Sequence, residues 1–214
     1  LITTSNSQIA VSAHTPFYNK KKLPSNTKKG KSFFLSGPKA LHNALFQNNT
    51  PDYSAWNKLY SADLWKDNFF APRKFAEDLA TIPDILLNTN RIIVTTQPLY
   101  FYRKRKDSLL NTPYNKEKTE LLEIAENLLE KISTKDKRLI PAAENTLLSA
   151  SFSILWKTPD TEEFSDVKKR AYKHILRLRF KSLFDTRTRF RNKAAVLFSL
   201  LGKRFLIFAL RRFG

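Results

Sequence analysis

The chain has 214 residues, and its 38 Lys and Arg residues against 19 Asp and Glu residues give a formal net charge of +19. Because 42% of the residues are hydrophobic, the chain has enough apolar side chains to fold around a core. The absence of cysteine excludes disulfides, thiol nucleophiles and cysteine-ligated metal sites. Methionine is also absent, from which we expect an upstream portion to be missing or processed away.

The positive charge is concentrated toward the C-terminus. Residues 167–214 contain 15 Lys and Arg residues and a single acidic residue, so they contribute +14 of the +19. The preceding residues are only mildly basic. A surplus of cations suits a partner rich in phosphate, such as nucleic acid, an anionic lipid surface or a nucleotide-linked substrate.

In chain order, the first part mixes strands and helices. The patterns predict strands at 9–13, 91–95 and 99–103, helices at 36–48 and 75–88, and an exposed loop at 19–31. Ser36 can cap the first helix, and Gly37-Pro38 provides an entry typical of a first turn. We expect that helix to end in the turn at 48–51, while Pro98 separates the last two strands.

After Pro113 the pattern is helical alone. Leu121, Ala125, Leu128 and Ile132 fall on one face of an amphipathic helix, and further helices are expected at 142–156 and 161–178. Between 194 and 214, apolar pieces alternate with paired cations, and no apolar run approaches the ~20 residues that a spanning helix requires. We expect an amphipathic helix in the membrane interface; the alternative is a helix packed on the protein with a solvated basic face.

The segment Glu77-Asp78-Leu79 is the most informative local feature. At about 100° per residue, Asp78 shares the apolar face of its helix with Ile82 and Ile85, whereas Glu77 turns outward. A buried carboxylate is costly unless it is paired, capped or functional, and desolvation raises its proton affinity. Two interpretations remain open: a functional carboxylate, or an acidic residue in the first helical turn, where the helix dipole favours an anion.

Two aromatic and basic segments are candidates for binding. The segment 100–106 ends a strand with alternating aromatic and basic residues, so Arg103 and Arg105 can contact a diphosphate or form a solvated strand end. The triplet Trp56-Asn57-Lys58 can contact a sugar through ring stacking and a polar pair, although Trp56 also suits a core.

Several chemistries have no motif in the chain. The three histidines are scattered without metal-ligand spacing, and the sequence has no Walker loop, no Gly-x-Gly-x-x-Gly and no Gly-x-Ser-x-Gly elbow. We therefore expect no metal ligand and no nucleotide-binding loop within these residues.

Several segments occur in a specific order and spacing. They are Trp56-Asn57-Lys58-Leu59-Tyr60, Asp63-Leu64, Phe70, Glu77-Asp78-Leu79, Arg91-Ile92 and Pro98-Leu99-Tyr100-Phe101-Tyr102-Arg103-Lys104-Arg105 with Ser108. Together they resemble the C-terminal half of the catalytic domain of bacterial family 2 glycosyltransferases, over about residues 30–112. The helix opening at 35–41 is also similar to the stretch that precedes the Trp-Asn-Lys block in that family.

The resemblance implies a GT-A fold, which is a Rossmann-like α/β sandwich, and inverting sugar transfer from a nucleotide sugar, a UDP-sugar, to a glycan or lipid-linked acceptor. The product would be a bacterial surface polysaccharide such as a capsule. By the same resemblance, Asp78 is the general base and Glu77 lies beside it. Substrate-binding roles fall on Trp56, Asn57, Lys58, Arg103 and Arg105.

The resemblance and the helical patterns after residue 113 together predict how the chain is organised. Residues 1–112 would be the C-terminal half of the catalytic domain, 113–193 a helical extension, and 194–214 a basic membrane-surface helix. The other half, with the Asp-x-Asp motif that holds Mg or Mn, is expected upstream, so the chain alone is expected to be inactive. The implied location is cytoplasmic, peripheral at the inner face of the cell membrane. The alternative function is a non-enzymatic basic helical protein that binds nucleic acid or an anionic membrane.

Overall fold

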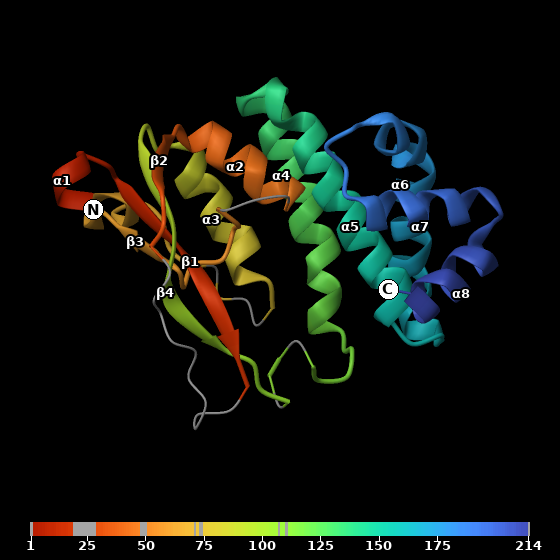
Figure 1. Cartoon of the computed structure of the whole chain (residues 1–214). Helices are drawn as coiled ribbons and strands as arrows, with labels where there is room; N and C mark the ends of the chain where they lie inside the picture. Colours follow the sequence, from red (N-terminus) through yellow and green to blue (C-terminus); the bar gives the residue numbers. More distant parts are fainter. Residues whose placement is uncertain are drawn as a thin grey trace. The chain divides into compact units, whose positions relative to one another are not determined.

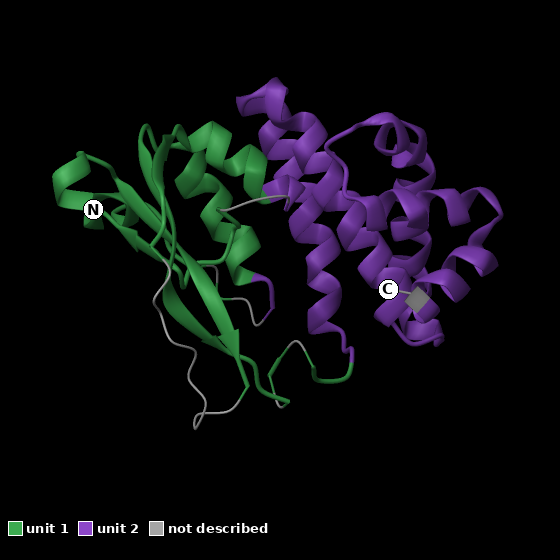
Figure 2. Cartoon of the chain, in the orientation of Figure 1, with its two compact units in different colours: residues 1–44, 49–73, 77–113 green, residues 45–48, 74–76, 114–214 purple. Residues whose placement is uncertain are grey.

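The computed structural model describes residues 2–18, 29–47, 51–70, 72, 75–106, 108–109 and 111–213. The chain divides into two compact units, which Figure 2 colours separately. Unit 1 comprises residues 1–44, 49–73 and 77–113, and unit 2 comprises 45–48, 74–76 and 114–214. Unit 1 contains both strands and helices, and the described elements after residue 113 are all helical. The predicted mixed α/β class is confirmed, whereas the three functional regions expected from the sequence stay a prediction.

Unit 1 contains a mixed sheet with the strand order β2-β4-β1-β3 (Figure 1). Its strands are β1 (Ile9–Phe17), β2 (Ser32–Leu35), β3 (Lys58–Tyr60) and β4 (Ile92–Arg103). The long strands β1 and β4 are parallel neighbours, while β2 pairs antiparallel with β4 and β3 pairs antiparallel with β1. The short strands β2 and β3 were not expected from the sequence, because three or four residues are too few for a period-two pattern to be distinctive.

The long strand β4 corrects the expectation of two strands at 91–95 and 99–103. It runs without a break through Pro98, at the place where its register with β1 shifts, so that Ser12 pairs with Thr95 and Ala13 with Pro98. An irregular register of this kind accommodates a residue that has no N–H to donate to the ladder. The strand β1 likewise continues to Phe17, beyond the expected end at residue 13.

Unit 1 also holds the helices α1 (Ile2–Ser5), α2 (Gly37–Phe46, whose last two residues fall in unit 2) and α3 (Glu77–Leu87). As predicted, Ser36 caps α2, since its hydroxyl accepts the N–H of Lys39 at 3.4 Å. The N–H of Gly37 donates to the carbonyl of Thr89 at 3.0 Å, so α2 begins directly against the end of α3. Figure 1 shows the two helices on the same side of the sheet. Most of the loop expected at 19–31 and most of the turn at 48–51 lie outside the described residues.

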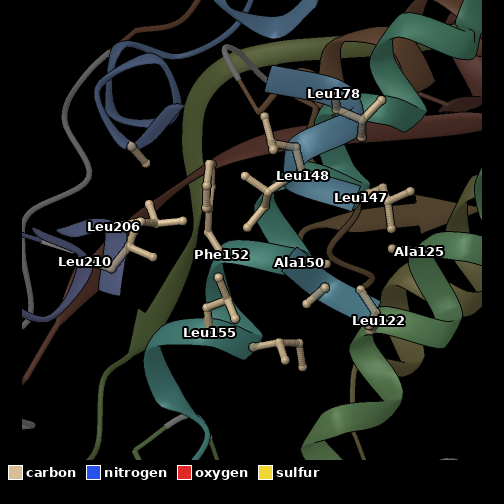
Figure 3. Packing of buried hydrophobic residues seen from close by; sticks show 14 of the residues in the cluster. Leu122, Ala125, Leu147, Leu148, Ala150, Phe152, Leu155, Leu178, Leu206 and Leu210 are labelled. Carbon is tan, nitrogen blue, oxygen red and sulfur yellow. The ribbon is translucent and has the colours of Figure 1, made fainter. Parts of the chain in front are cut away.

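Unit 2 is built from α4 (Glu120–Lys135), α5 (Ile140–Lys157), α6 (Ser165–Phe184), α7 (Phe190–Leu200) and α8 (Lys203–Phe213). Single 3₁₀ turns precede three of them, at Glu117–Thr119, Lys137–Leu139 and Glu162–Phe164. The core surrounds α5, and Figure 3 shows Leu147, Leu148, Phe152 and Leu155 from that helix within it.

The C-terminal segment differs from the single helix expected at 194–214. It forms the end of α7 and all of α8, and the chain turns between them at Gly202, whose φ of +104° favours glycine. Leu206 and Leu210 from α8 enter the core beside Phe152 (Figure 3). One face of α8 is therefore packed on unit 2. None of the described helices combines the length and the apolar character needed to cross a bilayer.

Candidate functional site

Asp78 lies in the first turn of α3. The helix begins directly after Ala76, whose φ of +56° is unusual for a residue with a side chain. The Asp78 side chain is half-buried, and its carboxylate accepts the backbone N–H of Ala55. Burial raises the pKa of Asp78, and this N–H opposes the rise. The neighbouring charge of Glu77, itself an exposed residue, raises the pKa further. Asp78 is thus a first-turn acid whose carboxylate is also partly desolvated, and a functional role for it stays a prediction.

The Lys58 ammonium lies inside unit 1, where its side chain is 0% exposed. Its Nζ donates to the Asp52 carboxylate at 3.2 Å, to Asn57 Oδ1 at 2.8 Å and to the carbonyl of Ser54. Burial lowers the pKa of Lys58, and the charges of Asp52 and Asp78 oppose that change. In this arrangement Lys58 holds the segment 52–58 together, and a ligand could contact Nζ only by displacing one of the three acceptors. Substrate contact by Lys58 stays a prediction.

Asn57 connects the same segment to β1. It is 5% exposed, and its Nδ2 donates to the carbonyl of Ser12 at 3.0 Å, while its own carbonyl accepts the Ser12 N–H at 3.0 Å. Asn57 and Lys58 therefore fix the backbone that presents both the Ala55 N–H and the Trp56 ring. Direct contact between Asn57 and a sugar stays a prediction.

The Trp56 ring belongs to an aromatic cluster. It stacks on Tyr102 with centroids 4.7 Å apart and an interplanar angle of 23°, and it lies 4.8 Å from Tyr100 at 35°. The His14 ring meets it edge-on at 4.8 Å. Tyr100 and Tyr102 are two residues apart on β4 and so project from the same side of the strand. Trp56 is half-buried, so part of its surface remains exposed beside these three rings.

Arg103 and Arg105 are exposed at and just beyond the end of β4. They line a hollow whose other walls include Tyr18, Lys104 and Lys106. Tyr102 also lines this hollow, so its ring joins the aromatic cluster to the basic surface. A concave site with four cations suits a phosphate-bearing ligand.

Several members of the site were not expected from the sequence. Asp52 pairs with Lys58, and Tyr60 lies close enough to Asp78 and Asp52 that their charges, after burial, raise the pKa of its hydroxyl. The alternation of Tyr100 and Tyr102 was a usable signal, because period-two aromatics on a strand share a face. Asp52 offered no such signal, since its pairing depends on how the loop before β3 folds back.

Within the described residues, no three His, Asp or Glu side chains gather in a way that could hold a metal ion. The divalent metal implied by the resemblance stays a prediction. In comparisons with known proteins, no family model matches the chain, and no curated protein matches it. The functional interpretation therefore depends on the residues themselves.

Proposed function

We propose that this chain forms part of an inverting glycosyltransferase, in which Asp78 is the general base that activates an acceptor hydroxyl. The supporting observation is the environment of Asp78. Its carboxylate is half-buried at the start of α3, it accepts the Ala55 N–H, and burial raises its pKa. A carboxylate that is both oriented and made more basic is suited to accepting a proton during catalysis.

In the proposed reaction, the acceptor oxygen forms a bond to the anomeric carbon of the donor sugar while its proton passes to Asp78. The bond between that carbon and the donor diphosphate breaks, and the diphosphate leaves with the electron pair. Because attack and departure occur on opposite faces, the anomeric configuration inverts. Arg103 and Arg105 would stabilise the charge that develops on the departing diphosphate, which is the role suggested by the basic hollow at the end of β4.

The aromatic cluster supports a sugar-binding role for the same region. The Trp56 ring is held at a defined angle by Tyr100 and Tyr102, and its backbone is anchored by Asn57. A rigid, partly exposed indole provides a flat apolar surface for the C–H face of a sugar ring. The donor would be a UDP-sugar and the acceptor a glycan or a lipid-linked glycan.

The test is transfer of labelled sugar from UDP-sugars by the natural gene product, with any coding sequence upstream of Leu1 retained. We expect Asp78→Asn to reduce turnover by about 10²–10⁴-fold, because the amide cannot accept the proton. The matched control is Asp166→Asn, an exposed carboxylate that pairs with Lys169 at 3.2 Å and lies outside the segments that carry the resemblance, and it should retain activity. Full turnover by Asp78→Asn would show that the base is assigned to the wrong residue.

A further inference from the structure

The helix α7 carries its apolar side chains outward. Its buried residues are small or polar: Asn192, Ala195, Val196 and Ser199. Its exposed residues are one cation, Arg191, and a group of large apolar side chains, with Leu201 just after the helix: Phe190, Leu197, Phe198, Leu200 and Leu201. Phe190 is 86% exposed and Leu201 is 63% exposed. With Leu197 they recur at helical spacing, so they form one outward stripe, the reverse of the usual amphipathic arrangement.

The rotation of α7 is set by hydrogen bonds. Asn192 is 2% exposed, and its Nδ2 donates to Ser149 Oγ at 2.8 Å and to Asn145 Oδ1 at 3.4 Å on α5. Turning the apolar stripe inward would separate these buried groups from their partners, which is costly. The exposed apolar stripe is therefore a stable feature of the folded unit.

The exposed side of α8 also carries large apolar side chains, and basic residues lie among them. Phe205 and Phe208 are exposed, as are Arg204 and Arg211, while Leu206 faces the core. The guanidinium of Arg211 also donates to the Asp160 carboxylate at 2.8 Å, which ties α8 to the turn before α6. Large apolar groups interleaved with cations are typical of helices that lie in the headgroup region of a bilayer.

A cavity of about 120 Å³ lies among α5, α7 and α8. Phe152 and Phe198 are among its apolar walls, and Lys157 and Arg191 line it as well. Burial lowers the pKa of Lys157, and the nearby charges of Lys118 and Arg191 lower it further. Cations that approach one another beside an apolar surface would be stabilised by an anionic headgroup.

We propose that the outward faces of α7 and α8, which we call the α7–α8 face, bind the surface of an anionic lipid bilayer. Phe190, Leu197 and Leu201 would enter the interface, and the surrounding Lys and Arg side chains would meet the headgroups. Charge supports this occupant, because residues 167–214 carry 15 cations against one acidic residue. A second copy of the chain would bring the same cations face to face. The inference does not depend on the proposed glycosyl transfer.

The experiment is co-flotation of the 214-residue chain with phosphatidylcholine vesicles that contain or lack phosphatidylglycerol. We expect the chain to float with the anionic vesicles, and its binding to weaken as salt increases. The variant Phe190→Ser/Leu201→Ser should weaken binding by about a hundredfold, because each apolar side chain lost from the interface is worth about tenfold. The matched control is Phe69→Ser/Leu59→Ser in unit 1, where these side chains are 78% and 60% exposed, and it should bind as the parent does.

A second pair of variants tests the charge. Lys157→Gln/Arg191→Gln should weaken binding to the anionic vesicles by about thirtyfold, which is the contribution expected of two cations at an anionic surface. Lys131→Gln/Lys135→Gln on α4 removes equal charge and should bind as the parent does. Circular dichroism establishes that each variant is folded. The proposal is overturned if Phe190→Ser/Leu201→Ser binds vesicles as the parent does. The proposal is also overturned if the parent does not bind vesicles and instead sediments as a dimer that Phe190→Ser/Leu201→Ser dissociates. In that case a second copy of the chain would occupy the α7–α8 face.

Discussion

Asp78 lies where burial opposes ionisation, and the Ala55 N–H and the Lys58 charge favour the anion only in part. Because burial is the largest cause, the pKa is raised, and the folded protein holds this proton to a higher pH than the unfolded chain does. The folded state then binds more protons between the two pKa values, so stability falls as pH rises through that interval. Loss of stability at a single carboxylate is common where that carboxylate serves a function.

The first prediction concerns Asp78→Asn, which removes the charge and keeps the shape. At neutral pH the variant should be more stable than the parent by up to about 1 kcal/mol, because a neutral amide avoids the desolvation of an anion. The difference should vanish at acid pH, where Asp78 is protonated in both states. Urea unfolding followed by tryptophan fluorescence measures both values. A less stable variant at neutral pH would mean that the Ala55 N–H outweighs burial.

The second prediction separates the buried Lys58 from a surface lysine. Lys58→Met leaves Asp52, Asn57 and the Ser54 carbonyl without their shared donor, so we expect unfolding to become easier by about 2 kcal/mol. The control is Lys66→Met, because Lys66 is 73% exposed and pairs with Asp63 at the surface, where such a pair contributes less than about 1 kcal/mol. Equal urea midpoints for the two variants would contradict a structural role for Lys58.

Between elements, the contact of α2 with α3 leaves no space for a side chain. A Cβ placed on Gly37 would lie 1.9 Å from the carbonyl oxygen of Leu86 and 2.2 Å from that of Thr89. Both atoms belong to backbone, which cannot turn aside as a flexible side chain can. Gly37 is thus required by close approach, and the same contact holds the end of the helix whose first turn carries Asp78.

The third prediction concerns the close contact between α2 and α3 at Gly37. Gly37→Ala should destabilise unit 1 by about 3 kcal/mol, because the two helices must separate to admit one methyl group. Lys39→Ala, at an exposed position of the same helix, should change stability by less than about 0.5 kcal/mol. Thermal unfolding of the two variants provides the comparison, and an unperturbed Gly37→Ala protein would show that α2 and α3 are free to move apart.

Across unit 2, the last two helices are part of the core. Ala195 and Val196 from α7 and Leu206 and Leu210 from α8 are buried against the cluster around α5. The basic C-terminal segment is consequently not a detachable tail. Deleting this segment would remove side chains from the core of unit 2 and impair folding, so a deletion cannot report on the interactions of its surface alone.

The fourth prediction uses two truncations. A chain that ends at Lys193 should lose more than about 5 kcal/mol, since four buried side chains leave the core, and that loss approaches the total stability of a typical domain. A chain that ends at Leu210 keeps all four and should unfold close to the parent temperature. Calorimetry with binding of a hydrophobic dye distinguishes them. Equal stability of the two truncations would contradict the packing of α7 and α8.

The sequence by itself determined the features that depend on neighbours along the chain. Periodicity predicted α3 to α6 and placed Asp78 on the same helical face as Ile82 and Ile85. Composition showed that the charge is concentrated in the last 48 residues. Only the tertiary structure decided that Ala55 orients Asp78, that Lys58 is buried, and that Asn192 turns the apolar stripe of α7 outward. These depend on hydrogen bonds and burial between segments distant in sequence, whose energies exceed the local preferences that periodicity records.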